Sequence, residues 1–129
     1  MSGIDHTGLS VSDYAAARRF YDAALKPLGI SMRTEFPKAQ TGDFDVALYG
    51  TAAGSIFVIG GGGKATPHIH VAFKADTHAE VDAFYAAAMA AGGRDNGPPG
   101  IRAHYNPNYY AAFVFDPDGN NIEAVCRKA

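Results

Sequence analysis

The stretch HIHVAFKADTHAEVDAFYAAAMAAGG, residues 68–93, decides the fold because its pattern occurs twice in the chain. The other copy is HTGLSVSDYAAARRFYDAALKPLG, residues 6–29, and the two align without gaps when His6 is placed on His70. A repeat spaced by more than about 50 residues is too long for a solenoid unit, so it indicates two copies of one supersecondary module. The other identical pairs are Ala15 and Ala79, Phe20 and Phe84, Tyr21 and Tyr85, Ala23 and Ala87, Ala24 and Ala88, and Gly29 and Gly93.

Each copy predicts a strand, a helix and then three more strands. Ser12 is the expected N-cap of the first helix, and Thr77 with Glu80 forms a capping box before the second. Apolar residues at three- and four-residue spacing follow each cap; Gly29 ends the first helix, and Gly92 and Gly93 end the second. Strands are predicted at residues 4–11, 31–36, 44–50 and 54–60 in the first module, and at 68–75, 100–105, 109–115 and 120–126 in the second.

The sequence therefore predicts an α+β fold made of two tandem βαβββ modules. We expect one domain, residues 1–129, with module one at 1–63 and module two at 64–129. The modules are expected to form a cup-shaped mixed sheet with both helices on its outer face. Gly60 to Lys64 is interpreted as a linker and not as a phosphate loop, because Ala65 follows the lysine and no helix begins there.

Composition argues against several classes of partner. The net charge is −2, and the Lys and Arg residues are scattered, which disfavours nucleic acid and membrane surfaces. No apolar run approaches the roughly 18 residues of a membrane span, and the N-terminus lacks the pattern of a signal peptide, so we expect a cytoplasmic protein. The single cysteine, Cys126, lies in an apolar strand pattern and is expected to be a buried hydrophobe.

Three potential metal ligands follow from the repeat. His6 and His70 lie on the strand faces opposite the apolar residues, and Glu123 has the corresponding orientation in the last strand. If the modules face each other, two imidazoles and one carboxylate converge, a set that binds a divalent ion and leaves positions open for water or substrate. The alternative is structural, with two half-buried histidines and a hydrogen-bonded edge carboxylate. His68 shares a face with His70 and is a candidate substitute ligand.

The segments IDHTGLSV, HIHVAF and FVFDPDGNNIEAV, set in paired βαβββ modules, resemble the vicinal oxygen chelate superfamily. That superfamily includes glyoxalase I, fosfomycin-resistance thiol transferases, bleomycin-resistance proteins and extradiol dioxygenases. The resemblance covers essentially the whole chain, and DPDGNNIE is its most specific element. It implies metal ligands at His6, His70 and Glu123.

One position departs from glyoxalase I. That enzyme has a fourth ligand in the first module, and aligning Ile56 with Ile122 places Phe57 at this position. Because Phe57 cannot accept a proton, standard glyoxalase I activity is not expected, and Phe57 is interpreted as a substrate contact. The extradiol dioxygenases carry a Tyr where Phe113 stands, so a dioxygenase is the least favoured reaction.

Several aromatic and basic residues are expected near this site. His104 and Tyr109 are the candidate catalytic residues, and Arg102 offers an anchor for an anion. Arg102 and His104 could equally form an outward-facing, solvated pair. The candidate substrate-binding residues are Phe57, Arg102, Tyr110 and Phe113.

The leading functional hypothesis is a glyoxalase-like metalloenzyme that chelates a small oxygen-bearing substrate on one divalent ion, Zn, Ni, Mn or Fe. Lyase, isomerase and thiol transferase chemistry all remain open. The alternative is a metal-free small-molecule binding protein of the bleomycin-resistance type. An accessory subunit is a third possibility. We expect a homodimer, with the site built either within one chain or between two.

Overall fold

The structure is a computed structural model that describes residues 3–42, 44–62 and 69–129. It confirms an α+β fold with two βαβββ-like modules. The predicted module boundary at residues 63 and 64 and the candidate ligand His68 lie outside the described residues. The first module contains β1 (Thr7–Ser10), α1 (Tyr14–Leu25), the 3-10 helix η1 (Lys26–Leu28), β2 (Ser31–Phe36), α2 (Lys38–Thr41), β3 (Val46–Thr51) and β4 (Gly54–Gly60). The second contains β5 (His70–Lys74), α3 (His78–Ala90), β6 (Arg94–Ile101), β7 (Tyr110–Phe115) and β8 (Asn121–Cys126).

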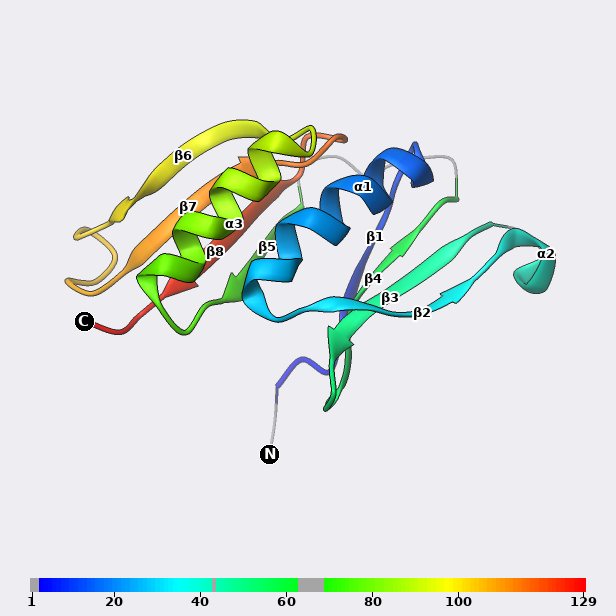
Figure 1. Cartoon of the computed structure of the whole chain (residues 1–129), viewed down its shortest axis with the longest axis horizontal. Coiled ribbons are helices and arrows are strands. Elements are labelled where there is room, and N and C mark those ends of the chain that lie inside the picture. Colours follow the sequence, from blue (N-terminus) through cyan, green and yellow to red (C-terminus); the bar gives the residue numbers. More distant parts are fainter. Residues whose placement is uncertain (1–2, 43, 63–68) are drawn as a thin grey trace.

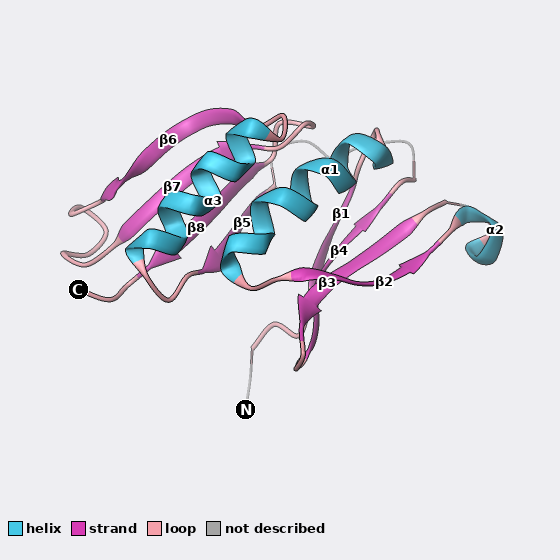
Figure 2. Ribbon diagram, in the orientation of Figure 1, coloured by secondary structure: helices cyan, strands magenta, loops and turns pink. Residues whose placement is uncertain are grey.

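Among the described residues, the strands form two four-stranded sheets with the same topology. The strand order is β1-β4-β3-β2 in the first sheet and β5-β8-β7-β6 in the second. In each sheet the first strand of the module lies at an edge and runs parallel to the last strand, while the other pairs are antiparallel. Figures 1 and 2 show α1 and α3 side by side, with one sheet extending to either side of the helix pair.

The core lies on the helix-facing sides of the two sheets. Phe57 of β4 and Phe73 of β5 meet there edge to face, with ring centroids 5.2 Å apart, so the two modules share one apolar cluster.

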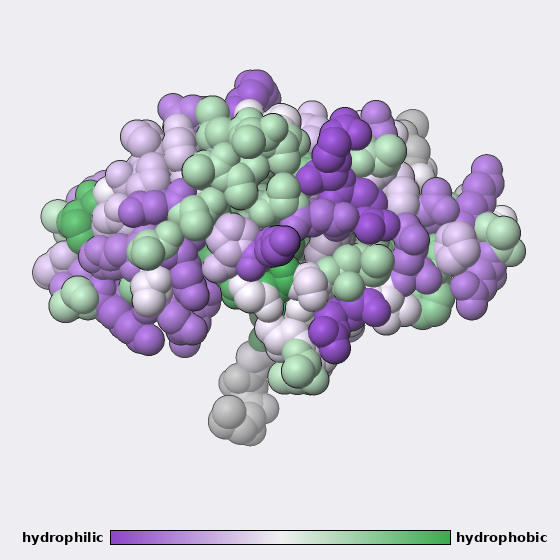
Figure 3. Space-filling model, viewed as in Figure 1, coloured by the Kyte–Doolittle hydropathy of each residue, from purple (hydrophilic) through white to green (hydrophobic). Residues whose placement is uncertain are grey.

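The outer side of α3 carries exposed alanines and is pale green in Figure 3. No helix among the described residues has the length and apolar character needed to cross a membrane.

The helix boundaries depend on short polar and glycine residues. Thr77 accepts a hydrogen bond from the Glu80 amide, as the capping box predicts. Ser12 was the expected cap of the first helix, but the structure shows Asp13 in that role. The Asp13 carboxylate accepts a hydrogen bond from the Ala16 amide at 3.0 Å. The Ser12 hydroxyl instead donates to Asp118 in the turn between β7 and β8.

The matched glycines Gly29 and Gly93 meet different requirements. Gly29 follows η1 with φ 76°, a left-handed conformation that favours glycine. At Gly93, a Cβ atom would lie 2.5 Å from Val114 Cγ1 and 2.8 Å from Phe20 Cε1. Gly93 therefore allows the end of α3, the second sheet and α1 to approach closely.

Strand β6 is longer than the sequence analysis predicts. The predicted strand covers residues 100–105, whereas the strand in the structure spans Arg94–Ile101, which includes NGPPG, and residues 102–105 form a turn. Register shifts between Asp95 and Gly97 and between Gly97 and Gly100 accommodate the two prolines at the sheet edge.

The register of the sheets corrects the predicted counterpart of Glu123. In the second sheet Ala72 lies opposite Glu123, and in the first sheet the matching residue, Gly8, lies opposite Val58. Phe57 is fully buried on the helix side. A shift of one residue along a strand turns a side chain to the opposite face, so Val58 and not Phe57 occupies the position of Glu123.

A buried polar cluster joins the two modules at the DPDGNN turn. Asp116, which is 1% exposed, accepts a hydrogen bond from the Tyr21 hydroxyl of α1 at 2.6 Å and from the side-chain amide of Asn120 at 2.9 Å. Burial, together with the adjacent charge of Asp116, raises the pKa of Tyr21 well above its usual value. The neutral hydroxyl therefore remains a donor to the carboxylate across the physiological pH range.

We predict that Tyr21→Phe lowers the free energy of unfolding by about 1.5–3 kcal/mol, because the buried Asp116 carboxylate loses a charged hydrogen bond. Tyr14→Phe is the control, since it removes a more exposed hydroxyl that donates to Glu35. The control should cost less than about 1 kcal/mol. Denaturant unfolding monitored by circular dichroism measures both values, and equal losses would contradict the inferred role of the cluster.

The register can be tested with one charge placed at two neighbouring positions. Phe57→Glu should cost more than about 4 kcal/mol because it places a carboxylate in the apolar core, and this variant should be largely unfolded. Val58→Glu places the same carboxylate at a partly exposed position and should cost less than about 1.5 kcal/mol. Thermal unfolding compares the two variants; greater damage from Val58→Glu would show that the assigned faces are reversed.

Candidate functional site

Glu123 is the centre of the candidate site. Its side chain is 1% exposed, although it projects from β8 onto the face of the second sheet that points away from α3, here called the open face. Glu123 Oε1 lies 2.8 Å from His70 Nε2 on β5, and Glu123 Oε2 accepts a hydrogen bond from the Tyr109 hydroxyl at 2.5 Å. A buried carboxylate is thereby held by one side chain from β5 and one from the loop that precedes β7.

Sheet pairing brings these groups together. Asn121 and Glu123 alternate with the helix-facing Ile122 on β8, and β5 runs parallel so that His70 lies opposite Asn121. On the other side of β8, Phe113 of β7 lies directly opposite Glu123. The open face therefore carries a carboxylate flanked by an imidazole and an aromatic ring.

Tyr109 holds Glu123 as a neutral donor. Burial first, and then the hydrogen bond to Glu123, raise the pKa of Tyr109 to about 12. The phenol is protonated at neutral pH, so its hydroxyl is the donor in the hydrogen bond to Glu123. This arrangement suits Tyr109 to orienting the carboxylate or donating a proton, and not to acting as a base.

A hollow of about 660 Å³ opens beside Glu123. His104 borders it from the turn that follows β6, with its ring 4.2 Å from that of Tyr105. Tyr105 in turn lies edge to face with Tyr109 at 5.0 Å. The residues lining the hollow are His70, His104, Tyr105, Tyr109, Phe113, Asn121, Glu123 and Arg127.

The predicted substrate contacts divide between two faces. Arg102 lies on the open face, with its guanidinium 5.4 Å from the centre of the Phe113 ring. Tyr110 was predicted as a contact but points to the helix side, where its hydroxyl donates to Asp82 and its ring stacks on His78 at 4.0 Å. Phe57 is also wrong as a contact because it lies in the core.

His6 is not part of this cluster within the chain. It is exposed, and its Nδ1 lies 2.7 Å from the Asp5 carboxylate. In residues 3–42, 44–62 and 69–129, no three side chains of His, Cys, Asp or Glu come close enough to hold one ion. The structure thus brings together two members of the predicted ligand set, His70 and Glu123.

Arg127 and Asn121 also line the hollow and were not predicted from the sequence as site residues. Both continue the two-residue alternation of β8 that places Glu123 on the open face, so this period was the signal that could have identified them. The Arg127 guanidinium lies over the Tyr109 ring at 4.9 Å. Its side chain therefore contacts a residue that binds Glu123.

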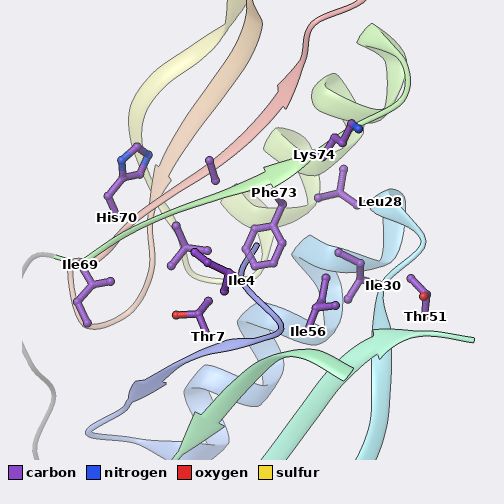
Figure 4. A pocket seen from close by; sticks show the side chains of 12 residues that line it. Ile4, Thr7, Leu28, Ile30, Thr51, Ile56, Ile69, His70, Phe73 and Lys74 are labelled. Atoms are coloured by element: carbon purple, nitrogen blue, oxygen red, sulfur yellow. The ribbon is translucent and has the colours of Figure 1, made fainter. Parts of the chain in front are cut away.

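A separate apolar groove of about 480 Å³ lies beside β5, between the modules. Figure 4 shows His70 and Lys74 toward opposite ends of β5, with Ile4, Ile56 and Phe73 between them. Ile4 is 86% exposed and Ile56 is 39% exposed, so apolar surface continues out of the groove. His70 borders both this groove and the hollow at Glu123.

Comparisons with known proteins identify close structural relatives. The structure superposes with a TM-score of 0.79 on a glyoxalase/bleomycin resistance protein from Albidiferax ferrireducens T118, at 33% identity, covering 98% of this chain and 100% of that one. A glyoxalase-related enzyme from Fulvimarina pelagi gives a TM-score of 0.70 at 19% identity, covering 98% and 88% of the two chains. Glyoxalase I from Zea mays gives 0.72 at 18% identity, covering 98% of this chain and 44% of that one.

The two matches below 25% identity show a common fold only. None of the curated proteins matches this sequence. A family model described as Glyoxalase/Bleomycin resistance protein/Dioxygenase superfamily matches residues 3–124, which is nearly the whole chain. This chain therefore belongs to the glyoxalase/bleomycin resistance protein/dioxygenase superfamily.

Proposed function

We propose that this chain is a glyoxalase-like metalloenzyme that binds one divalent ion through His70, Glu123 and His6. The observation that carries the proposal is the buried carboxylate of Glu123, held 2.8 Å from a histidine on an open sheet face beside a hollow. Buried carboxylates without a chemical task are uncommon because their desolvation is costly. The site is large enough for a small oxygen-bearing substrate.

His70 and Glu123 fit a shared metal ion. The 2.8 Å separation of His70 Nε2 and Glu123 Oε1 is close to the roughly 3 Å between adjacent ligand atoms on an ion with bonds of about 2.1 Å. Imidazole nitrogen and carboxylate oxygen together suit Zn, Ni, Mn or Fe. Tyr109 would then serve as the outer partner that orients the carboxylate ligand.

We place His6 in the site through a second copy of the chain. Within one chain His6 is exposed and paired with Asp5, away from the other two ligands. In the described residues, β1 and β5 each have one edge without a strand partner, and exposed Ile4 lies beside the groove along β5. A twofold dimer that covers this surface would bring His6 of one copy toward His70 and Glu123 of the other.

When bound, the ion would supply Lewis-acid polarisation of the substrate oxygens. The chain's own side chains supply the other functions: His104 is a titratable group at the mouth of the hollow, and the protonated Tyr109 phenol donates a hydrogen bond to the Glu123 carboxylate. Val58, at the position equivalent to Glu123, cannot accept a proton. The site therefore favours lyase, thiol transferase or other isomerase chemistry over standard glyoxalase I chemistry.

A metal-free binding protein of the bleomycin-resistance type is the second candidate function. The observation that favours it is that both Glu123 oxygens already have protein partners, His70 and Tyr109. A carboxylate satisfied in this way can serve a structural role in a pocket wall. The apolar groove beside β5 adds a surface suited to a ligand without a metal.

Metal analysis separates the two candidates. Protein purified without chelator should contain close to one divalent ion per chain by inductively coupled plasma mass spectrometry. His70→Ala and Glu123→Gln should each lose most of it, because each removes a ligand. His104→Ala is the matched control and should keep the metal. Retention of metal in His70→Ala would disprove the ligand assignment, while metal-free wild type would support the binding-protein alternative.

A mixing experiment tests whether two chains share the ligand set. His6→Ala and His70→Ala homodimers should each be metal-poor. When they are unfolded together and refolded at equal amounts, about half of the dimers carry both variants, and each of these regains one intact site, so about a quarter of the sites should bind metal. If His6 and His70 act within one chain, the mixture should bind no more metal than the separate variants.

A further inference from the structure

Two arginines, Arg102 and Arg127, lie at the open face. Arg102 and Arg127 form no ion pair with any carboxylate in the part of the chain that the structure describes. Arg127 lines the hollow beside Glu123, and Arg102 lines an adjoining hollow. The two hollows share His104, Tyr105, Phe113 and Asn121 as a common wall.

Arg102 is held in a fixed position. Its Nη2 atom donates to the Pro98 carbonyl at 2.6 Å, and its guanidinium lies over Phe113. Two glycines make room for the Arg102 guanidinium because they have no side chain. A Cβ at Gly97 would lie 3.1 Å from Arg102 Nη2, and one at Gly100 would lie 3.0 Å from Arg102 Nη1. The irregular NGPPG segment of β6 therefore forms a seat for this side chain.

Arg127 is positioned by the tail that follows β8. Cys126 is fully buried and ends the strand, and Arg127 lies over the Tyr109 ring. The next residue is tied to the start of α3, because the Lys128 carbonyl lies 3.1 Å from His78 Nε2 and its ammonium lies 3.7 Å from Asp76. These contacts direct Arg127 toward the hollow and Lys128 away from it.

The charge at this surface differs from that of the whole chain. The chain carries a net charge of −2, whereas the lining of the two hollows contains the cations Arg102 and Arg127 and one carboxylate, Glu123, which is already hydrogen-bonded. Aromatic rings lie beside both cations. A guanidinium set on an aromatic face offers its free N–H groups to an anion while the ring excludes water.

We propose that the two adjoining hollows on the open face together bind an aromatic carboxylate. The ring of the ligand lies against Tyr105 and Phe113, and the carboxylate of the ligand binds Arg102 or Arg127. This inference rests on the proposed function in locating the functional site at the open face, but it does not require the metal. Arg127 and Arg102 are then specificity-determining residues for anionic ligands. A guanidinium recognises a carboxylate through paired N–H donors, which distinguishes it from a neutral group of the same shape.

The test is direct binding by isothermal titration calorimetry to the full chain in the presence of EDTA. The probe is 2-naphthoate, and 2-naphthylmethanol is its neutral counterpart. The naphthoate should bind at least tenfold more tightly than the alcohol, because only the carboxylate gains the charged hydrogen bonds. The Arg102→Gln/Arg127→Gln double variant should lose at least tenfold in naphthoate affinity, and the single variants show which guanidinium takes the carboxylate.

Arg94→Gln is the matched control, since Arg94 also lies over an aromatic ring, Phe115 at 5.1 Å, but does not line either hollow. It should bind naphthoate within twofold of wild type, and circular dichroism should show that all variants are folded. Equal affinity for the acid and the alcohol, or a double variant within twofold of wild type, would overturn the inference. Because the titration is run in EDTA, it tests anion binding without metal, whereas the metal content of protein purified without chelator tests the metalloenzyme. Metal-free protein that still binds naphthoate would count against the metalloenzyme alone.

Discussion

The hydrogen bond from Tyr21 to buried Asp116 is the constraint on which the arrangement of the two modules depends. It joins a helix of the first module to the last turn of the second, over 95 residues of sequence. Asn120 extends the same cluster to the Ile69 amide, just before β5, so the turn also fixes where that strand begins. The position of His70 against Glu123 is therefore coupled to a polar cluster that immediately precedes β8.

The repeat was sufficient to predict the modules, because strand and helix periodicities are local and both copies carry them. The helix cap and the start of β6 were mispredicted because neighbouring residues or alternative conformations compete locally. Ser12 and Asp13 are both good caps, and only the contact of Ser12 with Asp118 decides between them. NGPPG has the composition of a turn, but pairing with β7 stabilises it as a bulged edge strand. Phe57 was misplaced because an alignment within apolar strands has no polar residue to fix its register.

The candidate site was predicted in part for the same reason. His70, Glu123, His104 and Tyr109 belong to one module, so the pairing of β5, β8 and β7 and the short loop between β6 and β7 bring them together. The relation of His6 to them depends on how one module packs against the other, or against another chain, and no local pattern encodes that. Tyr110 shows the limit of composition, since one of two adjacent tyrosines on a strand must face the helix.

Gly29 and Gly93 have a consequence for how the duplicated halves can diverge. Gly29 is required for its backbone angle, and a Cβ there would meet open space, so asparagine, which tolerates the left-handed region, can replace it. Gly93 is required for its lack of a side chain, because even alanine would clash with Val114, Phe20 and the Ala88 carbonyl. The two matched glycines therefore meet different structural requirements. Related proteins built from the same two modules should be able to lose the first glycine while retaining the second.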